Sequence, residues 1–199
     1  MTGADSPDSL GRLDRLGSLA RRIVTLHETL DSLRVPHQFG GALALAWYRN
    51  PRATTDIDVN LTLPPDAAPP LLGALSVLGV TVTDADLSLV ARDGQARLDW
   101  EGSYLDVFFA TLDFHHDMAR AARLVRFGPV EIPILAPEHL VVCKAVFDRP
   151  KDWVDIEEMV AWGTPIDAAT ALGWMDSIVR GRSPQRTRLA RLLATADQS

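Results

Sequence analysis

Residues 39–63 read FGGALALAWYRNPRATTDIDVNLTL, and the end of this stretch decides the fold. From Thr55 to Leu63 polar and apolar residues alternate, which predicts a β-strand. Side chains at positions i and i+2 of a strand point to the same face, so Asp56 and Asp58 project together. Two neighbouring carboxylates repel each other, and a hard divalent cation such as Mg²⁺ relieves that repulsion. The stretch therefore predicts a metal-binding strand.

A third acid, Asp106, interrupts the otherwise apolar strand candidate Tyr104–Phe109. If this strand lies beside the one with Asp56 and Asp58, three carboxylates converge. Three carboxylates suffice to hold two metal ions about 3.5–4 Å apart, as in enzymes that transfer phosphoryl or nucleotidyl groups. The alternative for each acid taken alone is an aspartate that faces solvent.

Two glycines, Gly40 and Gly41, stand between the strand candidate Val35–Phe39 and the helix candidate Ala42–Tyr48. The first turn of a helix offers free backbone N–H groups and the positive end of the helix dipole. Glycine also lets the backbone approach a phosphate closely. The alternative is a tight turn without a ligand.

The order of these features resembles the nucleotidyltransferase superfamily, whose signature is hG(G/S) followed by DhDh. Gly40–Gly41 and Asp56–Val59 match that signature. The stretch 39–63 is similar to the minimal AbiEii/MenT-like branch, in which an arginine-threonine segment precedes DID. KAVFDRPKDWVDIEEM, at residues 144–159, is similar to the lysine helix and following segment of the same branch. The matched motifs span residues 36–160.

This resemblance implies a nucleotidyltransferase fold, a mixed β-sheet flanked by helices, and a role for each matched residue. Asp56 and Asp58 would be the paired metal ligands. Asp106 would be the third carboxylate and the base that takes the proton of an acceptor hydroxyl. Gly40 and Gly41 would hold the triphosphate. Many relatives have serine where this chain has Gly41, so one hydroxyl ligand for phosphate is missing.

Further matched positions lie outside the two short motifs. Lys144 resembles the family lysine that contacts the nucleotide phosphates and takes part in catalysis; a surface lysine is the alternative. Asp152 is expected in the catalytic set. Asp155 is expected near the nucleotide, or alternatively in a surface ion pair with Lys151. The remaining predicted nucleotide-binding residues are Arg49, Arg52 and Thr55, although both arginines can also be ordinary loop charges.

The implied activity is transfer of a nucleoside monophosphate from an NTP to an acceptor hydroxyl, with two Mg²⁺ ions. Likeness to the AbiEii branch implies a toxin of a toxin–antitoxin pair, with a cognate antitoxin protein as partner. For some members of that branch the acceptor is the tRNA 3′ end. Two alternatives stay open: a protein or small-molecule acceptor such as an antibiotic, and a non-catalytic partner-binding protein of the same fold. Retention of three costly acids argues against the last.

The whole chain has 199 residues, 47% hydrophobic and 23% charged, which is typical of a folded globular protein. No apolar run reaches the ~18–20 residues needed to cross a bilayer, so we expect a cytoplasmic protein without a membrane partner. The net charge of −6 does not indicate general nucleic-acid binding. The segment 178–192 is nevertheless rich in arginine, either as a solvated helix face or as a phosphate-contacting arm. Its arginines are Arg180, Arg182, Arg186, Arg188 and Arg191.

Local patterns predict an α/β domain over residues 1–136 and a helical subdomain over 137–199. Helices are expected at 9–34, 42–48, 71–78, 114–124, 137–147, 150–162, 166–179 and 185–196. Strands are expected at 35–39, 55–63, 80–83, 87–91, 96–100, 104–109 and 130–135, with a proline-rich loop at 64–70.

The remaining chemically distinctive residues carry weaker signals. Cys143 lies in an apolar helical run, where we expect a buried thiol that acts as a small hydrophobe. The adjacent His115 and His116 point to different sides, which disfavours a metal site. The five tryptophans are scattered, and we expect them in packing rather than in base stacking.

Overall fold

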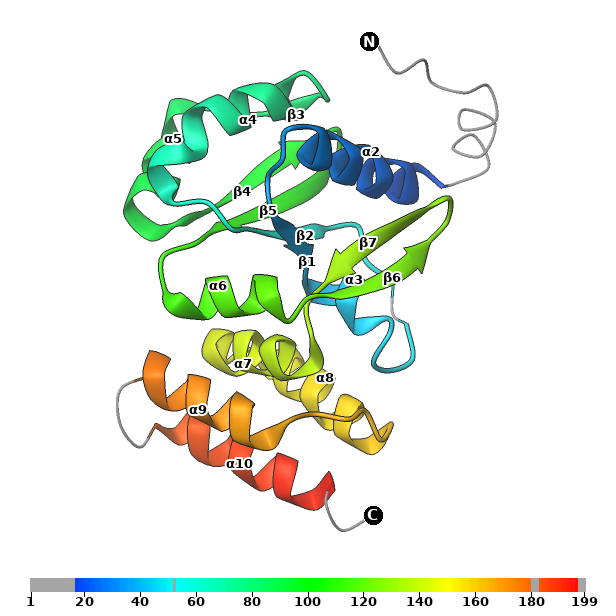
Figure 1. The fold of residues 1–199 in the computed structure, drawn as a ribbon, viewed down its shortest axis with the longest axis vertical. Coiled ribbons are helices and arrows are strands. Elements are labelled where there is room, and N and C mark those ends of the chain that lie inside the picture. Colours follow the sequence, from blue (N-terminus) through cyan, green and yellow to red (C-terminus); the bar gives the residue numbers. More distant parts are fainter. Residues whose placement is uncertain (1–16, 52, 180–182, 197–199) are drawn as a thin grey trace. The chain divides into compact units, whose positions relative to one another are not determined.

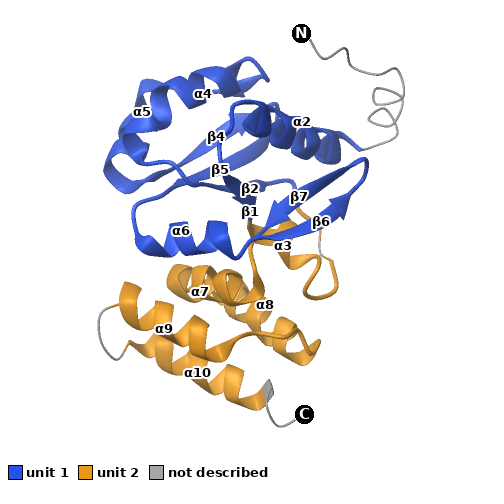
Figure 2. Ribbon diagram, in the orientation of Figure 1, with its two compact units in different colours: residues 1–39, 55–134 blue, residues 40–54, 135–199 orange. Residues whose placement is uncertain are grey.

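The structure, a computed structural model, describes residues 17–51, 53–179 and 183–196 (Figure 1). The chain forms two compact units, of which the first comprises residues 1–39 and 55–134 and the second residues 40–54 and 135–199 (Figure 2). The predicted domain boundary near residue 136 stays a prediction, because compactness does not test whether a segment folds alone. None of the helices in the described ranges is both long enough and apolar enough to span a bilayer.

The first unit is built on a seven-stranded mixed sheet in the order β3-β4-β5-β2-β1-β7-β6. The pairs β2–β5 and β1–β7 are parallel, and the other neighbours are antiparallel. The strands are β1 (His37–Phe39), β2 (Ile57–Leu61), β3 (Val80–Thr81), β4 (Gln95–Trp100), β5 (Ser103–Phe109), β6 (Arg123–Phe127) and β7 (Val130–Ile134).

Alternation in β2, β4 and β5 sets a buried, mainly apolar face against a face that carries Asp58, Arg97 and Asp106. The apolar residues Ile57, Leu98 and Val107 are fully buried, whereas Arg97 and Tyr104 on the opposite face are exposed. In the described residues of this unit, four helices and one 3₁₀ turn accompany the sheet, with α5 packed against β4 and α6 against β1. They are α2 (Ser18–Ser32), η1 (Pro65–Ala67), α4 (Ala68–Ser76), α5 (Asp84–Asp93) and α6 (Asp113–Arg120).

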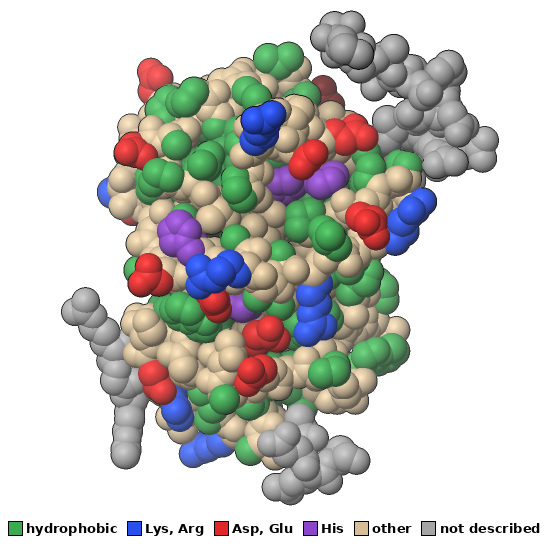
Figure 3. All heavy atoms as spheres, viewed as in Figure 1, with side chains coloured by type: hydrophobic (Ala, Val, Ile, Leu, Met, Phe, Trp, Pro, Cys, Tyr) green, Lys and Arg blue, Asp and Glu red, His purple; other side chains and the backbone are tan. Residues whose placement is uncertain are grey.

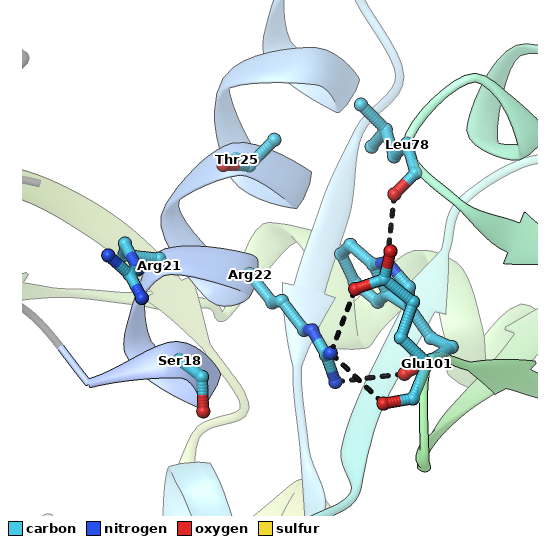
Figure 4. Close-up of a pocket in the computed structure, with 7 residues that line it drawn as sticks. Ser18, Arg21, Arg22, Thr25, Leu78 and Glu101 are labelled. Carbon is cyan, nitrogen blue, oxygen red and sulfur yellow. Dashed lines mark hydrogen bonds and ion pairs between the residues drawn. The ribbon is translucent and has the colours of Figure 1, made fainter. Parts of the chain in front are cut away.

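A two-residue turn joins β4 to β5. Glu101 and Gly102 both have positive φ, 49° and 83°, which is the pattern of a type I′ hairpin. Arg22 of α2 fixes this turn, because its guanidinium donates to the carbonyl oxygens of Trp100 and Glu101 and to the Glu101 carboxylate. Figure 4 shows these contacts in a cavity of about 270 Å³. The Arg22 donors are thus committed to holding the hairpin.

Several segments of the first unit differ from the sequence prediction. The predicted strand 87–91 is part of α5, because a capping box between Thr83 and Asp86 starts a helix and Gly94, at φ 71°, ends it. The predicted helix 114–124 stops at Arg120, and a strand, β6, follows. In the predicted loop 64–70, Pro69 and Pro70 lie in the first turn of α4, where a missing N–H costs nothing.

The described part of the second unit is helical, with helices close to those predicted at 137–147, 150–162, 166–179 and 185–196, and it also contains the short helix α3. The helices α7, α8, α9 and α10 pack against one another, and α3 packs against α7. The Tyr48 hydroxyl, just after α3, donates to the Leu135 carbonyl at 2.7 Å and so joins the two segments of the unit. The helices are α3 (Gly41–Leu45), α7 (Pro137–Phe147), α8 (Pro150–Ala161), α9 (Ala168–Ile178) and α10 (Pro184–Ala196).

Candidate active site

The polar face of the sheet in the first unit collects the acids of β2 and β5. Asp58 and Asp106 are register partners on these parallel neighbouring strands, so their side chains emerge on the same face. Asp56 lies two residues before Asp58, immediately ahead of β2, and accepts a hydrogen bond from the Thr55 hydroxyl at 3.1 Å. The predicted neighbourhood of the two acidic strands is therefore present.

Arg97 of β4 enters this acidic face and was not among the predicted site residues. It is the cross-strand partner of Asp106, and its Nε and Nη2 donate to the two carboxylate oxygens of Asp106 at 2.8 and 2.7 Å. Its Nη2 also lies 3.6 Å from Asp56 Oδ2. Hydrogen bonding by Asp106, together with the charges of all three aspartates, raises the pKa of the Arg97 guanidinium above its ordinary value.

The donor chemistry at this face suits Mg²⁺, because Asp56 and Asp58 supply the oxygen ligands that hard cations take. The geometry fits only in part. Across the described part of the chain, no group of three histidine, cysteine, aspartate or glutamate side chains is arranged to hold a metal ion. Both oxygens of Asp106 are engaged by Arg97. The two-metal prediction therefore has its three carboxylates on one face of the sheet, and the third, Asp106, is bonded to an arginine.

In the second unit, Lys144 of α7 and Arg49 converge on Asp155 of α8. Lys144 Nζ donates to one carboxylate oxygen at 2.6 Å, and Arg49 Nη2 donates to the other at 2.8 Å. The Asp155 side chain is 3% exposed and that of Lys144 is 6% exposed. The alternative of Lys144 as a surface lysine is wrong, because its ammonium is buried against an anion.

Further charges extend this cluster. The carboxylate of Asp152 is buried and bonds the Arg149 guanidinium, with Lys144 Nζ 3.7 Å from it. Arg49 Nη1 also pairs with Glu158. Oppositely charged groups alternate through the cluster, which offsets the cost of taking each of them out of water. Cys143, next to Lys144 on α7, is half-buried, whereas a buried thiol was predicted.

The glycine pair opens a shorter helix than predicted. The helix α3 has only five residues and ends at Leu45, so its dipole offers less to an anion than the predicted helix through Tyr48 would. Gly41 has φ 53°, a conformation that favours glycine. Arg52 lies outside the described residues.

The arginine-rich segment is largely paired with acids where it is described. Arg186 bonds Asp176, while Arg188 pairs with Glu157 and stacks over Trp153 at 4.3 Å. Basic and acidic side chains are interspersed over the face seen in Figure 3. Arg180 and Arg182 lie outside the described residues.

His115 and three tryptophans have the following surroundings. The Leu112 N–H donates to His115 Nδ1 at 3.2 Å, so this ring caps α6. Trp100 and Trp153 are buried, as expected for packing, but Trp162 is exposed.

Comparison with known proteins gives a match by structure only. A scan against protein-family models found no match, and a search of curated proteins also found none. The crystal structure of ANT(2″)-Ia in complex with adenylyl-2″-tobramycin matches with a TM-score of 0.52 at 15% identity, over 90% of this chain and 99% of that one. The solution structure of the antibiotic-resistance factor ANT(2″)-Ia gives 0.51 at 14% identity, over 90% and 92%.

The lincomycin-bound lincosamide antibiotic adenylyltransferase LnuA matches with a TM-score of 0.50 at 14% identity, over 70% of this chain and 94% of that one. At these identities the likeness shows the fold. The chain has the nucleotidyltransferase fold, which confirms the predicted fold class. The AbiEii/MenT-like branch stays a prediction.

Proposed function

We propose that this protein is a divalent-metal-dependent nucleotidyltransferase that moves a nucleoside monophosphate from an NTP to an acceptor hydroxyl. The acceptor oxygen forms a bond to the α-phosphorus while the bond from that phosphorus to the bridging oxygen of the β-phosphate breaks, and pyrophosphate leaves. The acceptor proton passes to a carboxylate. The observation that carries the proposal is the register of Asp58 with Asp106 on neighbouring parallel strands, two residues after Asp56.

In this proposal Asp56 and Asp58 hold the metal, and Asp106 is the base or third ligand. A bound divalent cation would neutralise charge on the phosphate oxygens. The aspartates act by position: parallel neighbouring strands lie about 4.8 Å apart, which brings the acids within reach of one bound group. Because Asp106 is bonded to Arg97, it can accept a proton only after that pair opens.

The nucleotide-binding assignments are also part of the proposal. Gly40 and Gly41, with Arg52 and Thr55, are assigned to the phosphates on the strength of the sequence resemblance alone. The same resemblance assigns four further residues to binding or transfer of the nucleotide: Lys144, Arg49, Asp152 and Asp155. The present bonds of Lys144 and Arg49 to Asp155 mean that a direct phosphate contact requires exchange of one anion for another.

Two acceptor classes are carried forward. Resemblance to the AbiEii branch supports an RNA acceptor such as the tRNA 3′ end, together with a toxin role, an antitoxin partner and a cytoplasmic location. The fold shared with ANT(2″)-Ia and LnuA supports a small hydroxylated antibiotic, since those proteins were solved with adenylyl-tobramycin and lincomycin. Pairing of Arg186 and Arg188 with acids leaves fewer positive charges for RNA, which favours the small acceptor.

The test is nucleotidyl transfer in vitro with Mg²⁺ and each of the four α-labelled NTPs. Parallel reactions contain total tRNA, tobramycin or lincomycin as the acceptor. We expect label on one acceptor class and a loss of about 100-fold or more in Asp58→Asn, which is typical when one electrostatic group of an active site is removed. Asp66→Asn, an exposed aspartate of the same unit outside the sheet face, is the matched control and should keep the wild-type rate.

Each outcome separates the candidates. Label that persists undiminished in Asp58→Asn contradicts the assignment of this residue. No label on any acceptor, together with no rise in melting temperature on adding NTP and Mg²⁺, favours the non-catalytic partner-binding protein, because a ligand that binds the native state must stabilise it.

A further inference from the structure

Arg97 is hydrogen-bonded to the carboxylate of Asp106, which the proposed chemistry needs as a base or metal ligand. The type I′ turn at Glu101–Gly102 fixes the register of the β4–β5 hairpin and sets Arg97 directly opposite Asp106. The guanidinium engages both oxygens of Asp106 in the parallel, two-bond geometry that makes such pairs strong. It also lies over the Tyr104 ring, 5.0 Å from the ring centroid.

The two partners differ in freedom. The Asp106 side chain is 14% exposed, whereas that of Arg97 is 52% exposed. Asp106 is therefore held by the sheet, while the guanidinium can move into solvent without unpacking a core residue. Its approach to Asp56 at 3.6 Å shows that the same cation already reaches a second acid.

A guanidinium and a metal ion would use the same oxygen lone pairs of Asp106. Binding of one must therefore weaken binding of the other, because two cations at one carboxylate also repel each other. The charge of Asp58 also acts on Arg97 and contributes to the raised pKa of the guanidinium.

We propose that Arg97 is a positioning residue that competes with the divalent cation for Asp106. The inference rests on the proposed function, since it concerns the same site. In the resting protein the cation enters through Asp56 and Asp58. Asp106 becomes available to the cation or to the acceptor hydroxyl only when the guanidinium moves away.

The test is direct binding of Mn²⁺, measured by electron paramagnetic resonance of free Mn²⁺ at constant ionic strength, without nucleotide. We expect Arg97→Gln to lower the Mn²⁺ dissociation constant about tenfold, and Arg97→Lys to give an intermediate value because lysine keeps the charge but loses the two-bond geometry. Arg92→Gln is the matched control. Arg92 makes the same kind of two-bond pair with Asp93, on α5, and its removal should leave Mn²⁺ affinity unchanged.

A second background shows whether Arg97 acts through Asp106. In Asp106→Asn, the gain from Arg97→Gln should shrink to less than about threefold, because the shared carboxylate is gone. A urea unfolding curve for each variant establishes that the folded proteins are compared. A purely structural arginine would move that curve and leave the Mn²⁺ affinity alone.

The outcomes distinguish this inference from the function on which it rests. If wild type binds Mn²⁺ and Asp58→Asn does not, but Arg97→Gln binds no tighter than wild type, the competition is refuted and the metal site stands. If no protein shows saturable Mn²⁺ binding without nucleotide, the competition is refuted, and the labelling assay with NTP and Mg²⁺ decides the metal-dependent function, because substrate phosphates often complete such a metal site.

Discussion

The buried carboxylate of Asp155 offers the sharpest test of how the second unit is held together. Asp155→Asn keeps the size of the side chain and removes its charge. Two cations, Lys144 and Arg49, then lose the negative charge of the carboxylate that they contact at 2.6 and 2.8 Å. A buried charge left without its counter-ion typically costs about 3–5 kcal/mol of stability.

Two nearby acids reduce this cost. Lys144 keeps Asp152 at 3.7 Å, and Arg49 keeps its pair with Glu158, so neither cation is left entirely uncompensated. Asparagine can still accept one hydrogen bond through its amide oxygen. We therefore expect a loss of about 2–4 kcal/mol in the free energy of unfolding, below the range for a fully orphaned pair.

The assay is urea unfolding followed by tryptophan fluorescence, since Trp153 is buried on the same helix as Asp155. The midpoint should fall while the slope m stays constant, which marks a change in stability rather than in the surface exposed. Asp176→Asn is the matched control: this exposed aspartate pairs with Arg186 in the same unit, and its loss should cost less than about 1 kcal/mol. Equal effects of the two substitutions would refute the argument that burial makes the Asp155 pairs important.

Two further predictions concern stability. Burial lowers the pKa of His27 and His37, whose rings bond each other through Nδ1 and Nε2 at 2.9 Å, and burial likewise lowers the pKa of His115. As the pH falls, the unfolded chain therefore takes up protons before the folded protein does, and the free energy of unfolding should decline below pH 6.5. Urea unfolding midpoints between pH 7.5 and 5 measure this decline. A midpoint that rises on acidification would contradict the prediction. Arg34 follows α2 with φ 56°, and Arg34→Gly should raise the free energy of unfolding by about 0.5–1 kcal/mol because glycine adopts this conformation without strain; destabilisation in the same urea assay would be the contrary result.

Helix and strand signals in the sequence accounted for most elements, and the failures have local causes. The segment 87–91 alternates like a strand, but the capping signals of Thr83, Asp86 and Gly94 on either side outweigh that pattern. β6 was missed because the turn signal at Gly128 was overlooked. Gly128, at φ 57°, begins a two-residue hairpin turn that pairs Phe127 with Val130. Turn chemistry would have found both.

The position of Arg97 beside Asp106 could also have been predicted from the sequence. Alternation in β4 places it on the face opposite Leu98, and the Glu101–Gly102 turn then sets it across from Asp106. The converging charges of the second unit were not accessible in this way. Arg49 and Asp155 are 106 positions apart, and the sequence around either residue gives no sign that the other is its partner.

The sequence by itself determined which face of each strand carries the acids, because side-chain direction in a strand follows a period of two whatever the strand pairs with. It likewise determined the helices from 137 onward through their periodicity and proline boundaries. Only the tertiary structure decided that β5 lies beside β2, across a crossover that contains a helix pair and two strands, and that Lys144 is buried against Asp155. Such contacts join distant segments, so they depend on how the whole chain packs, and no short-range pattern encodes them.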